Sequence, residues 1–215
     1  MKYSLEQAKN IVSDLIQVNS IEFIGYGNHS EAFCINGDMV LKLPKHHKAS
    51  ECLKIEMQVL QELTQKMPVE IPNVLFNGTF LSGCEEFVYF VSKRLNGKNL
   101  TKEEFLLLDE QTLFHNAAII AEFLYRLHSE KNVFAIKKDL VLLHGDLSLN
   151  HILFNDKNLV CGILDFADSR VGKPERDFVY LLDEEDTEEF GTDFGKLVLS
   201  LYKSYKFSVG ERNFF

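Results

Sequence analysis

The sequence lacks the features that would place it in a membrane, on a secretory route or among disulfide-stabilised proteins. No apolar run in its 215 residues approaches the roughly 20 residues that a membrane-spanning helix needs. The first seven residues contain no signal-peptide core. The four cysteines lie far apart and form no Cys-x-x-Cys pair, which argues against a disulfide frame or a zinc site. We therefore expect a cytoplasmic protein with reduced thiols and no membrane partner.

An excess of basic charge is also absent. The chain has 23 Lys and Arg against 32 Asp and Glu, and its net charge is −9. A nucleic-acid-binding protein needs a basic face, so we expect no nucleic-acid partner. The acidic balance is compatible with a cationic small molecule, but on its own it is weak support, because most acidic proteins are acidic for solubility. The 46% hydrophobic content is ordinary for a globular protein.

The order of the expected elements indicates an α+β chain with two lobes. Apolar spacing and turn residues predict a helix over residues 3–18, two strands over 21–35, a strand over 38–43, a helix capped by Ser50 and running to about residue 66, and strands over 71–91. After residue 97 the pattern changes to helices, and the clearest of these covers residues 112–128. We expect a hinge near residues 93–98.

Two aspartates at the ends of apolar runs carry the strongest chemical signal. Asp146 lies in His-Gly-Asp-Leu-Ser-Leu-Asn-His at residues 144–151, and Asp165 follows 19 residues later in Gly-Ile-Leu-Asp-Phe-Ala. A kinase catalytic loop has such an Asp, then a metal-binding Asn, then a second metal-binding Asp before Phe. Either aspartate alone would be an ordinary strand end. Together they predict phosphoryl transfer, with Asp146 as the catalytic base and Asp165 as a ligand of Mg²⁺, which prefers oxygen.

His151 occupies the position of the metal-binding Asn. A neutral imidazole nitrogen can bind a metal, although it suits Mg²⁺ poorly. We therefore expect His151 either to join Asp165 as a metal ligand or to hydrogen-bond Asp146 or a phosphate. His144 is expected to support the loop through hydrogen bonds, and Asp177 to brace it.

Lys42 interrupts an apolar strand, where a charge must face water or find a partner. Glu56 falls on the apolar stripe of the following predicted helix, and a carboxylate on a buried stripe needs a cation. Kinases hold nucleotide phosphates with a strand lysine paired to a helix glutamate. We favour Glu56 as the partner of Lys42 over Glu51 and Glu62, which lie off the stripe.

The turn Gly-Tyr-Gly-Asn-His-Ser at residues 25–30 is expected to cover the phosphates of ATP or GTP. Gly25 and Gly27 would let backbone amides approach phosphate oxygens closely, and Ser30 can donate a hydrogen bond. The pattern is weak by itself, because hairpin turns often carry Gly-x-Gly. Ser92 and Leu95, around the start of the expected hinge, complete the predicted nucleotide-binding set.

These motifs together resemble the aminoglycoside phosphotransferases, and the 2″-phosphotransferases most closely. The matching pieces extend from about residue 3 to about Tyr202, and 2″-type enzymes share a His at position 151. The resemblance implies a two-lobed protein-kinase-like fold, with an antiparallel sheet and one helix in a nucleotide-binding lobe (residues 1–95) and a mainly helical catalytic lobe (96–215). It also implies Mg²⁺, ATP or GTP as donor, and transfer to a hydroxyl of an aminoglycoside or similar compound, hence antibiotic resistance.

The chain departs from this family in the region that grips the acceptor. Only about 15 residues separate His128 from His144, where the family has a long helical segment, and its further C-terminal helices have no counterpart here. Lys173 stands where the family usually has an acidic residue. An alternative is therefore a kinase-like nucleotide-binding protein with little or no transferase activity. A protein kinase is a weaker alternative, because no long activation loop fits between Asp165 and Asp177.

Overall fold

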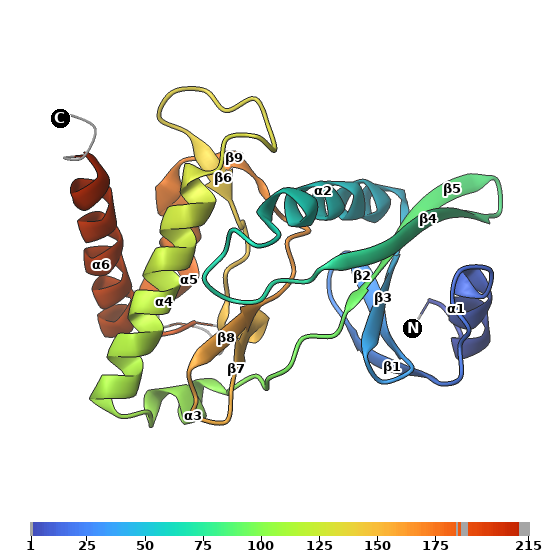
Figure 1. Cartoon of the computed structure of the whole chain (residues 1–215), viewed down its shortest axis with the longest axis horizontal. Helices are drawn as coiled ribbons and strands as arrows, with labels where there is room; N and C mark the ends of the chain where they lie inside the picture. The colour runs from blue at the N-terminus through green and yellow to red at the C-terminus, as the bar shows by residue number, and fades with distance from the viewer. Residues whose placement is uncertain (1, 184, 186–188, 211–215) are drawn as a thin grey trace. The chain divides into compact units, whose positions relative to one another are not determined.

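The computed structural model describes residues 2–183, 185 and 189–210, which form two compact units (Figure 1). The first unit contains the chain up to Gln61 together with Pro72–Leu95, and the second contains Glu62–Ile71 and the chain from Asn96 onward. Residues 62–71 belong to the second unit because Glu70 pairs with β8: its N–H donates to Cys161, and its carbonyl accepts from Ile163. No helix in the described ranges combines the length and apolarity needed to cross a membrane.

An antiparallel sheet of five strands forms the first unit. The strands are β1 (Ile21–Tyr26), β2 (Ser30–Ile35), β3 (Met39–Pro44), β4 (Val74–Ser82) and β5 (Glu85–Lys93), in the spatial order β1-β2-β3-β5-β4. Side chains at alternate positions of β2 and β3, such as Phe33, Ile35, Leu41 and Leu43, are fully buried. The strands expected over residues 21–35, 38–43 and 71–91 are confirmed.

The first helix is shorter than the predicted span of residues 3–18. Helix α1 (Leu5–Val12) begins with a capping box between Ser4 and Gln7 and ends where Ser13 takes the C-cap position. Beyond it, Ile16 and Val18 are both buried on either side of the exposed Gln17. Buried side chains at every second position are typical of an extended chain and not of a helix. Residues after α1 therefore bury their apolar side chains in an extended conformation.

Helix α2 (His47–Leu63) begins four residues earlier than a helix capped by Ser50 would, and Ser50 is not its cap. The Nδ1 atom of His46 accepts a hydrogen bond from the N–H of Ala49 at 3.1 Å, which satisfies one of the donors at the start of the helix. The hydroxyl of Ser50 instead accepts from the N–H of Val88 in β5 at 2.9 Å. The prediction was wrong because this long-range partner cannot be read from the local sequence.

The second unit combines helices with two small sheets. Its elements are α3 (Lys102–Leu106), α4 (Glu110–Ser129), β6 (Val141–Leu143), the 3₁₀ turn η1 (Leu149–His151), β7 (Ile152–Phe154), β8 (Val160–Ile163), β9 (Arg170–Gly172), the 3₁₀ turn η2 (Pro174–Phe178), α5 (Val179–Leu182) and α6 (Thr192–Gly210). Strand β6 pairs with β9, and β7 with β8. The helix expected over residues 112–128 is confirmed as α4, whereas α6 was not individually predicted.

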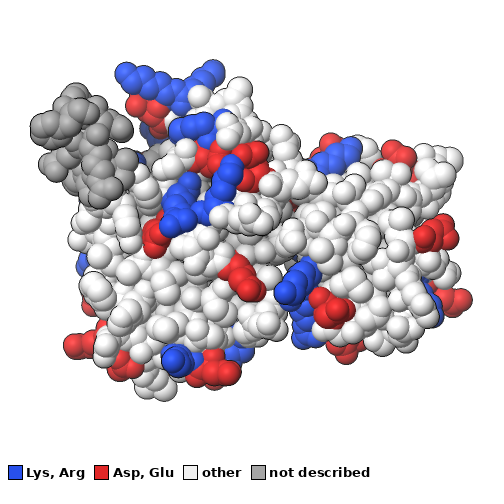
Figure 2. Space-filling model, in the orientation of Figure 1, with Lys and Arg blue, Asp and Glu red and all other residues white. Residues whose placement is uncertain are grey.

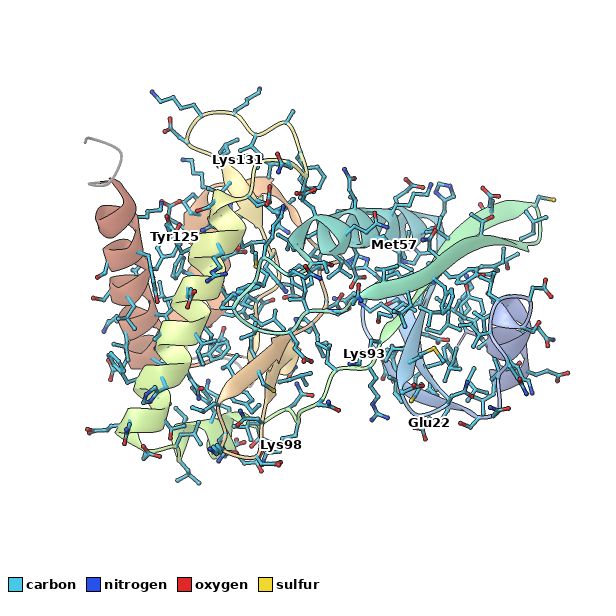
Figure 3. All side chains as sticks on the ribbon, in the orientation of Figure 1. Glu22, Met57, Lys93, Lys98, Tyr125 and Lys131 are labelled. Atoms are coloured by element: carbon cyan, nitrogen blue, oxygen red, sulfur yellow. The ribbon has the colours of Figure 1, made fainter. Side chains whose placement is uncertain are left out.

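Helices α4 and α6 lie side by side and cover one flank of this unit (Figure 1). Tyr125, labelled in Figure 3, points from α4 toward α6 and stacks on Tyr205, with ring centroids 5.6 Å apart. A Cβ added to Gly195 would lie 1.7 Å from the carbonyl oxygen of Leu181, so only glycine lets α6 approach α5 this closely.

Figure 2 shows several places where Lys or Arg side chains lie beside Asp or Glu side chains. Lys66 pairs with Glu62 and with Glu130, and Arg126 pairs with Glu122. These pairs are partly exposed and contribute little to stability. Glu62 is therefore already paired with Lys66.

Candidate active site

An ion pair between Lys42 and Glu56 joins β3 to α2 within the first unit. The Nζ atom of Lys42 lies 2.7 Å from Oε1 of Glu56, and the glutamate side chain is fully buried while that of the lysine is 15% exposed. The two alternatives are used elsewhere: Glu51 pairs with Lys54, and Glu62 with Lys66. The prediction that Glu56 is the partner of Lys42 is therefore confirmed.

The glycine-containing turn connects β1 to β2 and is tied to the residue after β3. The N–H of Gly27 donates to the carbonyl of Ser30, and the Nζ of Lys45 donates to the carbonyl of Gly27. Lys45 also lies over the Tyr26 ring at 4.8 Å. A Cβ added to Gly25 would meet nothing within 4 Å, so the backbone there is open to a ligand on that side.

Ser92 and Leu95 occupy different environments. Ser92 is buried in β5, where it pairs with Val40 on one side and Val74 on the other. Leu95 lies beyond the end of β5 and is half-buried. Their role in nucleotide binding stays a prediction.

Asp177 holds the loop at residues 144–151 of the second unit through the loop backbone. Its buried carboxylate accepts hydrogen bonds from the N–H groups of His144 and Gly145, each at 2.9 Å. Burial raises the pKa of Asp177, but the hydrogen bond and charge of His128, with smaller contributions from the loop, outweigh it and lower the pKa. The prediction that Asp177 braces the loop is confirmed.

His144 links the loop to the segment that leads from β8 into Asp165. Its Nε2 lies 3.0 Å from the carbonyl oxygen of Leu164, which can only accept, so Nε2 carries the proton. Its Nδ1 then accepts from the N–H of Asp146 at 3.3 Å. Burial lowers the pKa of this histidine, although the Asp177 carboxylate opposes the shift, and the neutral ring therefore fixes both neighbours. The predicted supporting role of His144 is confirmed.

Sequence reasoning missed two residues that extend this network. His128 on α4 places Nε2 3.0 Å from Asp177 and Nδ1 2.8 Å from the hydroxyl of Tyr202 on α6. Because a carboxylate oxygen can only accept, Nε2 carries a proton and donates to Asp177. Burial, followed by the charge of Asp177, raises the pKa of Tyr202 and keeps its hydroxyl protonated. Only the polar character of His128 on an apolar helix face could have signalled it.

His151 lies between the two predicted functional aspartates. Its Nδ1 lies 2.8 Å from the backbone carbonyl of Asp146, which fixes the proton on Nδ1. Its Nε2 lies 3.7 Å from Oδ2 of Asp165. Both side chains are partly exposed, at 20% and 30%.

Asp165 adopts a left-handed backbone conformation, with φ at 61°. Asp tolerates this region better than most residues, and such strain is common at functional sites. The carbonyl of His151 accepts from the N–H of Leu164 at 2.8 Å, so the peptide before Asp165 is tied to the loop. The loop and the strand end thus form one hydrogen-bonded cluster.

The donor set fits a divalent cation that also binds phosphate oxygens. An imidazole nitrogen and a carboxylate oxygen that lie 3.7 Å apart are both groups that can bind a cation. Within the described ranges no three His, Cys, Asp or Glu side chains gather as a complete metal site. Mg²⁺ typically takes only one or two protein ligands and completes its shell with water and phosphate.

Comparisons with known proteins agree with this geometry. Residues 130–207, which contain Asp146, His151, Asp165 and Asp177, match the model of the APH phosphotransferase enzyme family. The solved GDP and kanamycin complex of APH(2″)-IIIa is similar in fold, with a TM-score of 0.81 at 22% identity, over 93% of this chain and 83% of that one.

Two further structures extend the comparison. The streptomycin–ATP–APH(2″)-IIa ternary complex matches with a TM-score of 0.79 at 23% identity, over 99% of this chain and 86% of that one. The macrolide 2′-phosphotransferase MphH from Brachybacterium faecium matches with a TM-score of 0.65 at 14% identity, over 93% and 82%. Residues 130–207 thus match the model of a phosphotransferase enzyme family, and the chain has the α+β fold seen in these solved phosphotransferases.

Proposed function

We propose that this protein is a small-molecule kinase that transfers the γ-phosphate of ATP or GTP to a hydroxyl of an aminoglycoside or a similar hydroxylated compound. The observation that supports this most is the position of His151, whose ring contacts Asp146 on one side and faces Asp165 on the other. A catalytic base and a metal ligand held around one ring are what phosphoryl transfer requires. The solved relatives with kanamycin, streptomycin, ATP and GDP support the same class of reaction.

Asp146 is the proposed catalytic base. It is partly exposed, and its N–H is held by His144, so the carboxylate is available to orient an acceptor hydroxyl and take its proton. Proton acceptance of this kind typically contributes about 10²–10⁴ in rate. Because phosphoryl transfer needs little covalent help, positioning by the rigid loop is the larger part of its task.

The first unit is proposed to bind the nucleotide. Lys42, held by Glu56, would contact its phosphates, the turn with Gly25, Gly27 and Ser30 would cover them, and Ser92 and Leu95 would lie near the base. Asp165 and His151 would hold Mg²⁺, which when bound neutralises charge on the phosphate oxygens.

The test is turnover with a matched active-site variant. The purified protein is incubated with Mg-ATP or Mg-GTP and a panel of aminoglycosides and neutral polyols, and products are identified by mass spectrometry. We expect a phosphorylated product that is lost in Asp146→Asn, while nucleotide binding measured by calorimetry is retained. Nucleotide binding without any product would contradict the proposal and favour the alternative of a kinase-like nucleotide-binding protein without transferase activity.

A further inference from the structure

Arg170 lies against the catalytic loop, although the proposed chemistry does not use it. It is the first residue of β9 and pairs with Leu143, the residue before the catalytic motif. Its Nη1 donates to the carbonyl of Asp168 at 2.8 Å and lies 3.5 Å from the carbonyl of Gly145. A Cβ added to Gly145 would lie 2.6 Å from this nitrogen, so the guanidinium covers the peptide that leads into Asp146.

The positive charge of Arg170 has no carboxylate partner within the described part of the chain, and the residue is exposed. Its two contacts use Nη1 alone, whereas a guanidinium has five N–H donors. Its Nε and Nη2 groups therefore keep their donors for a further partner. The planar fork of an arginine matches a carboxylate or phosphate in a bidentate manner.

The glycine at position 145 allows the placement of Arg170 to be compared with that of an arginine in protein kinases. Protein kinases carry an arginine immediately before the catalytic aspartate, and kinase arginines order phosphorylated segments by pairing with their phosphates. Here the position before Asp146 is glycine, and the guanidinium of Arg170 fills the space from β9. The left-handed φ of Gly145, 90°, further restricts the position to glycine.

We propose that Arg170 forms an anion subsite beside Asp146, and that the acceptor carries a carboxylate or phosphate near the hydroxyl that is phosphorylated. This inference rests on the proposed function, since it names the acceptor class of that same site. An ammonium group placed against Arg170 would meet like charge, so among the acceptors of the proposed function the subsite favours anionic hydroxylated compounds over aminoglycosides.

The first experiment measures ligand binding at Arg170 by NMR. The protein is saturated with Mg²⁺ and a non-hydrolysable ATP analogue, and the Nε–Hε NMR signal of Arg170 is assigned by its loss in Arg170→Lys. Glucuronate, glucose and glucosamine share one ring and differ in charge, so they form a matched series. We expect a saturable shift of the signal with glucuronate and none with the other two. No shift with glucuronate would overturn the inference.

The second experiment measures kcat/KM for the same three sugars, with Lys157→Ala as an exposed basic control. Arg170→Ala should lower kcat/KM for glucuronate about tenfold or more, leave glucose within about twofold, and be partly rescued by Arg170→Lys. An equal loss of kcat/KM for all three sugars would overturn the acceptor assignment. It would indicate that Arg170 contacts the transferred phosphoryl group, whose oxygens offer the same anionic chemistry as an acceptor carboxylate. Product from glucosamine or aminoglycosides without an effect of Arg170→Ala would overturn it while the proposed function stands.

Discussion

In the first unit, one ion pair between Lys42 and Glu56 joins a strand to a helix, and the turn containing Gly25 leaves open space on one side. In the second unit, Asp177 alone accepts three hydrogen bonds, and a Cβ at Gly145 would lie 2.2 Å from a backbone oxygen. Under the proposed function, a nucleotide enters and leaves the first of these regions, so open space is useful there. The proposed base in the second unit has to stay fixed during transfer, and close packing serves that purpose.

The largest effect is expected from Asp177→Ala. This change leaves the N–H groups of His144 and Gly145, and the Nε2 of His128, without their acceptor in a buried place. Breaking such a buried network by removing one partner typically costs about 3–5 kcal/mol of unfolding free energy. Urea unfolding followed by circular dichroism measures the loss.

Asp156→Ala is the matched control, because Asp156 lies in an exposed turn. We expect its unfolding free energy to stay within about 0.5 kcal/mol of the wild type. Similar losses for Asp156→Ala and Asp177→Ala would contradict the idea that the second unit depends on this carboxylate.

A pair of identical substitutions sharpens the comparison between the units. Gly145→Ala combines a left-handed φ of 90° with a contact of 2.2 Å to the carbonyl oxygen of Asp168, so we expect a loss of about 3 kcal/mol. Gly25→Ala has no neighbour within 4 Å and should change the unfolding free energy by less than about 0.5 kcal/mol.

A nucleotide-binding measurement distinguishes an effect of Gly25→Ala on function from an effect on the fold. Because the glycine is proposed to let amides approach phosphates, Gly25→Ala should weaken Mg-ATP binding in calorimetry several-fold while the fold is unchanged. Unchanged affinity in a stable variant would remove the turn from the proposed nucleotide site.

The sequence predicted those parts of the site that depend on local spacing. The helical stripe identified Glu56 as the partner of Lys42, and the catalytic motif identified Asp146 and Asp165 as neighbours. The expected supporting roles of His144 and Asp177 are also confirmed. In each case a short motif restricts where the side chain can lie.

The parts that sequence reasoning missed depend on contacts between distant segments. His128 meets Asp177 across 49 residues and Tyr202 across 74, and no periodicity encodes such a meeting. Arg170 reaches Gly145 across 25 residues because β9 pairs with β6, two strands too short to be recognised by pattern. Ser50 shows the same effect in the first unit, where β5 takes the hydroxyl that was expected to cap α2.

A drop in pH is expected to have the smallest of these effects on stability, and to affect the second unit more than the first. Burial holds the pKa of His144 below its ordinary value of 6.5, so below that pH the unfolded chain binds a proton that the folded loop does not. The unfolding free energy should therefore fall as the pH drops from about 6.5, by up to about 1.4 kcal/mol per pH unit for this one group. The lowered pKa of Asp177 adds a further loss below its ordinary value of 3.8, because the folded carboxylate resists protonation.

Hydrogen exchange at pH 8 and pH 5.5 locates the loss. If His144 is responsible, amides of the catalytic loop and of β6 exchange faster at pH 5.5, after correction for the intrinsic rate, while those of β3 and β5 stay protected. Equal loosening of both regions would mean that the acid sensitivity belongs to the whole chain. The contrast between a tightly held loop and an open nucleotide turn would then have to rest on the substitutions alone.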